Sequence, residues 1–252
     1  MKIAGGAAVV TGAASGLGRA TAVALAAAGA EVLAVDLPAA AQDVEPVPGV
    51  TYVGADVTVP TQVERLFGRF DPLGTPLRVV VNCAGVAPSE RIVGRKGVHD
   101  IERFARVVQV NLVGSFAVLA HAAQVMARYP AGDDDQRGVV VNTASVAATD
   151  GQIGQAAYAA SKAGVAGLTL PAARDLAGLG IRVCAIAPGI IDTPMMATVG
   201  ADYRAGLAAG VPFPPRFGRP EEFARLVLSI VDNDYLNGEV IRLDGALRMA
   251  AR

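Results

Sequence analysis

The chain has 252 residues, of which 52% are hydrophobic and 18% are charged, and its formal net charge is -1. This balance lacks the basic excess of a nucleic-acid-binding protein, and the high apolar content argues against intrinsic disorder. The longest apolar run, residues 20–30, is too short to span a bilayer, and the N-terminus lacks a signal-peptide pattern. We therefore expect a globular protein that acts on neither nucleic acid nor membrane.

Apolar segments of strand length alternate with longer segments of helical periodicity. The predicted strands are residues 7–11, 31–35, 51–54, 78–82, 138–143, 182–187 and 240–243. The predicted helices are residues 16–28, 60–69, 101–129, 155–177 and 220–231. This alternation predicts an α/β fold with a single doubly wound parallel sheet of about seven strands and helices on both faces, as in the Rossmann fold. No linker divides the chain, so we expect one nucleotide-binding domain over residues 1–252, with a substrate lid around residues 190–215.

A glycine-rich turn follows the first predicted strand. Gly12, Gly16 and Gly18 stand in the order G-x-x-x-G-x-G, with Ser15 and Leu17 between them. Glycines permit a tight turn and the close approach of backbone N–H groups to a pyrophosphate, which the N-terminus of the following helix also favours. A tight turn without a ligand is the alternative, so the motif needs support from elsewhere in the chain.

Asp36 ends the second predicted strand and gives that support. A carboxylate at this point can accept both hydroxyls of an adenosine ribose, and it would repel a 2′-phosphate. Leu37 follows, where a basic residue would favour the phosphate. Asp36 and Leu37 together predict that the cofactor is NAD. The alternative is that Asp36 is only an exposed loop residue with no ligand.

Four polar residues indicate alcohol chemistry. Tyr158 and Lys162 are four residues apart, on one face of a predicted helix. An adjacent ammonium is expected to lower the pKa of the tyrosine, which could then exchange a proton with a substrate hydroxyl. Ser145 ends the fifth predicted strand and could orient the substrate oxygen, while Asn111 lies within a long helix, where asparagine is unfavourable without a role. Each residue alone could be structural, but the four together behind the glycine turn are more specific.

These motifs, taken in order, resemble the short-chain dehydrogenase/reductase family. The resemblance implies that Asn111, Ser145, Tyr158 and Lys162 are catalytic, that Gln155 contacts the substrate with Ser145 and Tyr158, and that the chemistry needs no metal. It implies a cofactor site built from Gly12, Ser15, Gly16, Leu17, Gly18, Asp36, Asp56, Val57, Asn82, Cys83, Ala84, Gly85, Tyr158, Lys162, Pro188, Gly189, Ile191 and Thr193. Cys83 stands where the family usually has asparagine, in a segment that lines the cofactor through its backbone.

Further segments, residues 141–148, 154–158 and 236–245, resemble the type 2 3-hydroxyacyl-CoA dehydrogenase branch of this family. The resemblance implies NAD-dependent oxidation of a 3-hydroxyacyl-CoA. It also implies a homotetramer in which the apolar C-terminal stretch, residues 241–249, packs between subunits. A basic insertion at residues 88–97 carries Arg91, Arg95 and Lys96, which we expect near the CoA phosphates, although its sequence differs from that of the branch.

Other functions remain open at this point. A hydroxysteroid or another bulky alcohol is the alternative substrate, and a non-catalytic NAD-binding redox sensor is the alternative of a different class. Cys83 and Cys184, the two cysteines, lie in apolar strand-like runs and are expected to be buried free thiols, which predicts a reducing, cytoplasmic compartment. His99 and His121 lie far from any cysteine cluster, so the sequence has no zinc-site spacing.

Overall fold

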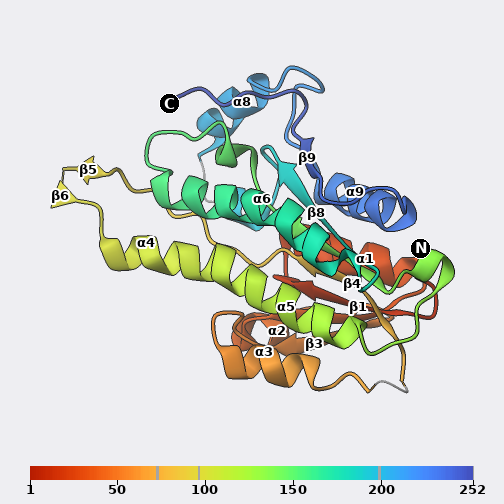
Figure 1. Ribbon diagram of the computed structural model, residues 1–252. Coiled ribbons are helices and arrows are strands. Elements are labelled where there is room, and N and C mark those ends of the chain that lie inside the picture. Colours follow the sequence, from red (N-terminus) through yellow and green to blue (C-terminus); the bar gives the residue numbers. More distant parts are fainter. Residues whose placement is uncertain (72–73, 96, 198–199, 252) are drawn as a thin grey trace.

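A seven-stranded parallel sheet with strand order β3-β2-β1-β4-β7-β8-β9 forms the centre of the computed structural model (Figure 1). The structure describes residues 1–71, 74–95, 97–197 and 200–251. The strands are β1 Ala7–Thr11, β2 Glu31–Asp36, β3 Val50–Gly54, β4 Leu77–Asn82, β7 Gly138–Thr143, β8 Ile181–Pro188 and β9 Val240–Leu243. The strand order reverses between β1 and β4, and ligands of such sheets bind beyond the carboxyl ends of the strands at this point.

Helices cover both faces of the sheet (Figure 1). α3 (Pro60–Phe67), α5 (Ser115–Met126) and α6 (Ala156–Ala177) lie over one face, and α1 (Gly16–Ala27) and α9 (Pro220–Asp232) lie over the other. Side chains alternate along each strand, so Val80 packs with α5 while Val79 and Val81 pack with α9. Full burial of one such valine contributes roughly 1.5–3 kcal/mol, which accounts for the continuous apolar runs of the strands.

The predicted α/β fold is confirmed, and every predicted strand is present with its ends within one residue of the prediction. The prediction of one α-helix over residues 101–129 is wrong in two respects. The segment consists of α4 (Ile101–Val108), the π-helical turn η1 (Gln109–Gly114) and α5, and it ends at Met126. By length and composition alone it could cross a membrane. Val118, Leu119 and Met126 nevertheless pack on the sheet, as in the core helix of an α/β protein.

Several short elements were not predicted. They are α2 (Pro38–Gln42), β5 (Val93–Gly94), β6 (Gly97–Val98), η2 (Asp133–Asp135), η3 (Val146–Ala148), α7 (Pro194–Ala197) and α8 (Ala201–Ala209). β5 and β6 form a hairpin that projects from the body beside the start of α4 (Figure 1). The basic insertion overlaps it: Arg95 lies between the two strands, Arg91 precedes β5, and Lys96 lies outside the described residues. The predicted lid contains α7 and α8, with residues 198–199 outside the described ranges.

Candidate functional site

The turn between β1 and α1 has a shape that only glycine allows. Gly12 and Gly16 have φ values of 65° and 52°, in the left-handed region. A Cβ on Gly12 would lie 2.7 Å from the Ala84 backbone nitrogen, and a Cβ on Gly18 would collide with the carbonyl oxygen of Gly12. Ser15 begins α1 without a side-chain hydrogen bond to the first turn, so no cap competes for those N–H groups. The turn therefore fits a phosphate group at a helix N-terminus.

Two other predicted cofactor segments meet this turn. The Ala84 N–H donates to the Thr11 hydroxyl at 3.2 Å, and the Cys83 N–H donates to the Thr11 carbonyl at 3.2 Å. A Cβ on Gly16 would lie 3.3 Å from the methyl carbon of Thr193. The structure thus brings the segments that follow β1, β4 and β8 to the same edge of the sheet, the edge at which the carboxyl ends of the strands lie.

Asp36 lies directly beside the glycine turn. One carboxylate oxygen accepts from the Ala14 N–H and the other from the Leu37 N–H, each at 2.8 Å. These bonds fix the carboxylate at one wall of an open hollow, which is lined by Ala14, Ser15, Arg19, Asp36, Ala40, Asp43, Val44 and Glu45. The charged residues among them are Asp36, Asp43 and Glu45, which are acidic, and Arg19, which is basic. The hollow has the position and the acceptors that an adenosine ribose needs.

Asp56 and Val57 follow β3, next to Asp36. The Asp56 carboxylate accepts from the Thr58 N–H at 2.8 Å and the Thr58 hydroxyl at 2.7 Å, and it lies 3.7 Å from Arg106. Burial opposes ionisation of Asp56, but these hydrogen bonds and the Arg106 charge lower its pKa overall. Val57 packs under η1, where a Cβ on Gly114 would lie 2.8 Å from a Val57 methyl carbon. The predicted contacts of both residues with the cofactor stay predictions.

Ser145 and Tyr158 come together beyond the end of β7. Ser145 begins the single turn η3, and its hydroxyl accepts from the Ala147 N–H at 3.1 Å. The Ser145 side chain lowers the pKa of Tyr158, but burial raises that pKa by more. Two hydroxyls at one point beside the cofactor turn can hold and protonate one substrate oxygen.

Lys162 lies under this pair but does not bond to the tyrosine. Its ammonium donates to the Thr143 carbonyl at 2.6 Å and lies 5.8 Å from the centre of the Tyr158 ring. Burial lowers the pKa of Lys162 to about 8, against a smaller opposing effect of Cys83. The prediction that Lys162 lowers the pKa of Tyr158 is wrong for this arrangement, because burial dominates at the phenol and the ammonium is held by β7.

Asn111 occupies the π-helical turn η1, and this explains its place within a helix. Its amide donates to the Ser161 hydroxyl at 3.0 Å and to the Val86 carbonyl at 2.9 Å, and its oxygen accepts from the Val86 N–H at 2.8 Å. A Cβ on Gly85 would lie 3.1 Å from the Asn111 oxygen and 3.7 Å from the Lys162 nitrogen. Glycine thus leaves space between two of the four predicted catalytic residues, and π-helical turns are frequent at functional sites.

Other predicted site residues use their side chains for support. Asn82 donates to Asn142 at 2.9 Å and to the Ser115 carbonyl at 3.2 Å, so only its backbone can face a cofactor. Gln155 donates to Gln152 at 3.2 Å. Ile191 pairs with Gly218 in an isolated β-bridge. These contacts position the segments around the crevice, and the predicted ligand contacts of these residues stay predictions.

Pro188 and Gly189 continue from β8 toward Thr193. The Gly189 N–H donates to the Leu243 carbonyl at 2.9 Å, and a Cβ on Gly189 would lie 2.8 Å from the Asp244 Cβ. The segment after β8 is therefore fixed against the end of β9. Sequence patterns indicated neither Ser161, nor the Thr143 carbonyl, nor the support from Asp244.

The cysteines are free thiols, as predicted: Cys184 is buried and Cys83 is half-buried. Burial raises the pKa of both, to about 11 for Cys83, so both are protonated at neutral pH. Over the described ranges, no group of three or more His, Cys, Asp or Glu side chains is arranged to hold a metal ion.

Known proteins resemble this chain in sequence and in structure. The short chain dehydrogenase family matches residues 6–204. The 3-hydroxyacyl-CoA dehydrogenase type-2 proteins of Drosophila melanogaster and Homo sapiens are 49% and 46% identical to it, covering 96% of this chain and 96% and 95% of their own lengths. A crystal structure of 3-hydroxyacyl-CoA dehydrogenase type-2 from Mycobacterium avium superposes with a TM-score of 0.90 at 41% identity, covering 98% of both chains. The chain belongs to the short-chain dehydrogenase family and is an oxidoreductase of the nicotinamide-dependent kind.

Proposed function

We propose that the protein transfers a hydride between NAD and a 3-hydroxyacyl-CoA. The clustering of Tyr158, Lys162 and Asn111 carries the proposal of alcohol chemistry: the Lys162 ammonium lies 5.8 Å from the centre of the Tyr158 ring, and a Cβ on Gly85 would lie within 4 Å of both Lys162 and Asn111. The acyl-CoA assignment rests on the similarity to relatives that are named as 3-hydroxyacyl-CoA dehydrogenases and match nearly the whole chain.

The residues divide the reaction between them. The nicotinamide ring, when bound, supplies the hydride acceptor. Tyr158, in its ionised form, would accept the proton that leaves the substrate hydroxyl and so become a neutral phenol, while the Ser145 hydroxyl holds the substrate oxygen as it becomes a carbonyl. Lys162 would bind the nicotinamide ribose. Asn111 holds the segment after β4 against α6, through its hydrogen bonds to Val86 and Ser161.

Electrostatics of the hollow favour NAD over NADP. Asp36 is fixed at the wall, and Asp43 and Glu45 face the same space, against Arg19 as the one cation among the lining residues. A 2′-phosphate would meet this negative field, whereas ribose hydroxyls can donate to Asp36.

Acetoacetyl-CoA with NADH is the direct test, since the reverse reaction consumes a cofactor whose near-ultraviolet absorbance can be followed. Oxidation of NADH that depends on acetoacetyl-CoA supports the proposal. Turnover of steroid alcohols with no turnover of acyl-CoA would make the bulky-alcohol dehydrogenase correct instead. Tight NADH binding without turnover of any alcohol or ketone would identify a redox sensor.

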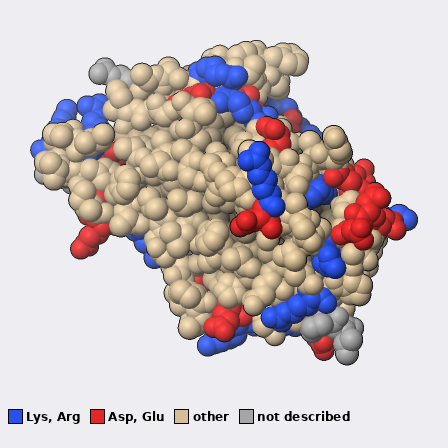
Figure 2. Space-filling model, in the orientation of Figure 1, with Lys and Arg blue, Asp and Glu red and all other residues tan. Residues whose placement is uncertain are grey.

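We further propose that four copies assemble and act in the cytoplasm. Few charged side chains lie over η1 and α5 (Figure 2), and Val113 of η1 and Phe116 of α5 are 42% and 54% exposed. Apolar surface of this kind is typical of protein–protein contacts. The two free thiols are compatible with a reducing compartment. Light scattering at micromolar concentration should give four times the chain mass, and the monomer mass would contradict the assembly.

A further inference from the structure

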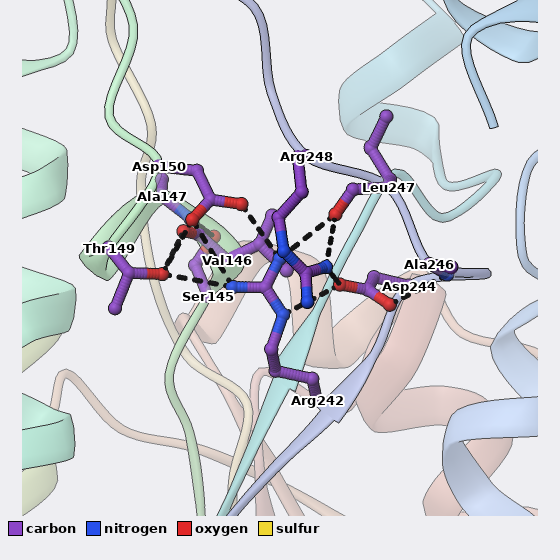
Figure 3. A network of polar contacts seen from close by, with 10 residues as sticks. All are labelled: Ser145, Val146, Ala147, Thr149, Asp150, Arg242, Asp244, Ala246, Leu247 and Arg248. Atoms are coloured by element: carbon purple, nitrogen blue, oxygen red, sulfur yellow. Dashed lines mark hydrogen bonds and ion pairs between the residues drawn. The ribbon is translucent and has the colours of Figure 1, made fainter. Parts of the chain in front are cut away.

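A guanidinium near the C-terminus joins two carboxylates that lie far apart in the sequence (Figure 3). Arg242, in β9, donates from one terminal nitrogen to Asp150 at 2.7 Å and from Nε to Asp244 at 2.7 Å. Its other terminal nitrogen donates to the Thr149 hydroxyl at 2.9 Å and again to Asp150 at 3.3 Å. Paired hydrogen bonds of this kind fix the orientation of both partners.

Asp150 and Thr149 end the turn that Ser145 begins. The Ala147 N–H donates to the Ser145 hydroxyl and the Ala148 N–H to the Ser145 carbonyl, at 3.1 and 3.0 Å. The Asp150 N–H donates to the Val146 carbonyl at 2.9 Å. The turn is therefore held at its start by β7 and at its far end by Arg242, with the proposed substrate-binding hydroxyl between them.

The other carboxylate belongs to the cofactor side of the crevice. Asp244 packs against Gly189 and also accepts from Arg248 at 3.2 Å. Beyond it, the C-terminal segment returns to the Ser145 loop, where Gln152 donates to the Ala250 carbonyl at 2.9 Å. The Ile153 N–H donates to the Ala251 carbonyl at 3.0 Å. One arginine thus links the loop of Ser145 to the segment that follows β8.

The positive charge of Arg242 neutralises two neighbouring carboxylates, so no uncharged side chain can take its place without cost. The side chains of Asp150 and Asp244 are 14% and 8% exposed, and that of Arg242 is 28% exposed. Without the guanidinium, two largely buried carboxylates would face each other with only the exposed Arg248 nearby. Hydrogen bonds from Arg242 hold the pKa of Asp150 at about 2, so the contact stays ionised at any working pH. Lysine restores the charge but not the planar, paired geometry.

We propose that Arg242 is a positioning residue that holds the Ser145 turn in register with the cofactor segment after β8. The inference rests on the proposed function, because its effect on turnover is read with that substrate pair. It predicts that loss of Arg242 displaces Ser145 without removing any group that touches substrate or cofactor.

Steady-state kinetics of Arg242→Met test this role. A displaced Ser145 weakens the transition state more than the ground state, so kcat should fall roughly 10- to 100-fold with little change in KM and an unchanged Kd for NADH. The rise of kcat/KM with pH in the oxidation direction should move to higher pH, as in Ser145→Ala, because a displaced Ser145 no longer lowers the pKa of Tyr158. Arg242→Lys should recover part of kcat.

Arg137→Met is the matched control. Arg137 directly precedes β7 at the opposite end from Ser145, and it donates to the Tyr129 and Leu179 carbonyls at 3.0 Å. It should alter stability without moving kcat or the pH profile. Asp150→Asn supplies a second, isosteric variant, and its combination with Arg242→Met should be no worse than Arg242→Met alone, since it weakens only a contact that Arg242→Met already removes.

Hydrogen exchange gives a readout that does not need activity. Amides of residues 146–150 should exchange faster in Arg242→Met than in the wild type, while amides of α1 and β1 stay protected. Unchanged exchange at residues 146–150, or a loss of kcat no greater than in Arg137→Met, would overturn the positioning role. A wild type that does not turn over acyl-CoA would instead reject the proposed function, and the exchange measurement would still decide the role of Arg242.

Discussion

The ammonium of Lys162 lies 2.6 Å from the carbonyl oxygen of Thr143, so the buried lysine is held by the strand that leads to Ser145. A buried ammonium with one carbonyl partner is poorly solvated, and this lowers the pKa of Lys162 to about 8. The same residue that serves the proposed chemistry therefore makes folding depend on pH.

Lys162→Met should remove one component of that dependence. The pKa of Lys162 is lower in the folded protein than the ordinary value of 10.5, so above about pH 8 the unfolded chain binds more protons and the folded state gains stability. From about pH 8 to pH 9 the free energy of unfolding of the wild type should rise by about 1 kcal/mol from this group. Cys83, whose pKa is raised to about 11, acts in the opposite direction above pH 9.

The measurement is urea denaturation of the wild type and Lys162→Met at both pH values. The difference between the two proteins isolates the lysine, because Cys83 is common to both. Equal changes in the two proteins would mean that Lys162 titrates normally.

Ser145→Ala should change the pH profile as well as the rate. The Ser145 hydroxyl lowers the pKa of Tyr158, so its loss should shift the rise of kcat/KM for alcohol oxidation to higher pH. Loss of one hydrogen-bond donor at the reacting oxygen should also lower kcat by roughly 10²–10³-fold. A lower kcat with an unmoved profile would separate Ser145 from the ionisation of Tyr158.

Asp36→Ala should weaken NAD binding and relax discrimination against NADP. The Asp36 carboxylate is fixed by the Ala14 and Leu37 N–H groups at the hollow where the ribose is expected. Asp43→Ala, which removes a carboxylate from the same hollow, is the control for charge alone. Steady-state kinetics with both cofactors measure the ratio, and an unchanged ratio in Asp36→Ala would reject the ribose contact.

Replacing Arg91 and Arg95 together with glutamine should raise KM for acyl-CoA and spare kcat. Both side chains are exposed in the basic insertion, residues 88–97. An exposed contact to a phosphate contributes about 1 kcal/mol or less, which corresponds to at most roughly a fivefold change in KM per cation. Replacing Arg128 and Arg174, which are exposed near the far ends of α5 and α6, gives the same change in net charge. Equal KM values in the two double variants would leave the insertion without a role in CoA binding.

The sheet was predictable because parallel strands covered on both faces must be continuously apolar, as in β4 and β7. The hairpin β5–β6 was not, since two-residue strands leave no periodic signal. Nor was the π-helical turn, because the apolar pattern continues through it and Asn111 was its one visible irregularity.

The catalytic residues were predictable because their order along the chain and the i, i+4 spacing of Tyr158 and Lys162 are local features that can be read directly from the sequence. Their partners were not. Arg242 interrupts an apolar C-terminal stretch, and that was a signal of a buried charge, but Asp150 lies 92 residues away. Such a pairing requires the fold, as does the bond between Asn111 and Ser161, 50 residues apart.

Tyr158→Phe, compared with the wild type in the reduction of acetoacetyl-CoA by NADH, tests the central claim most directly. The substitution keeps the half-buried ring and removes only the hydroxyl whose pKa the Ser145 side chain lowers. The variant should bind NADH as the wild type does, measured by the fluorescence of the bound cofactor, and lose roughly 10²–10⁴-fold in kcat. A variant that retains the wild-type kcat would remove Tyr158 from the mechanism and contradict the account.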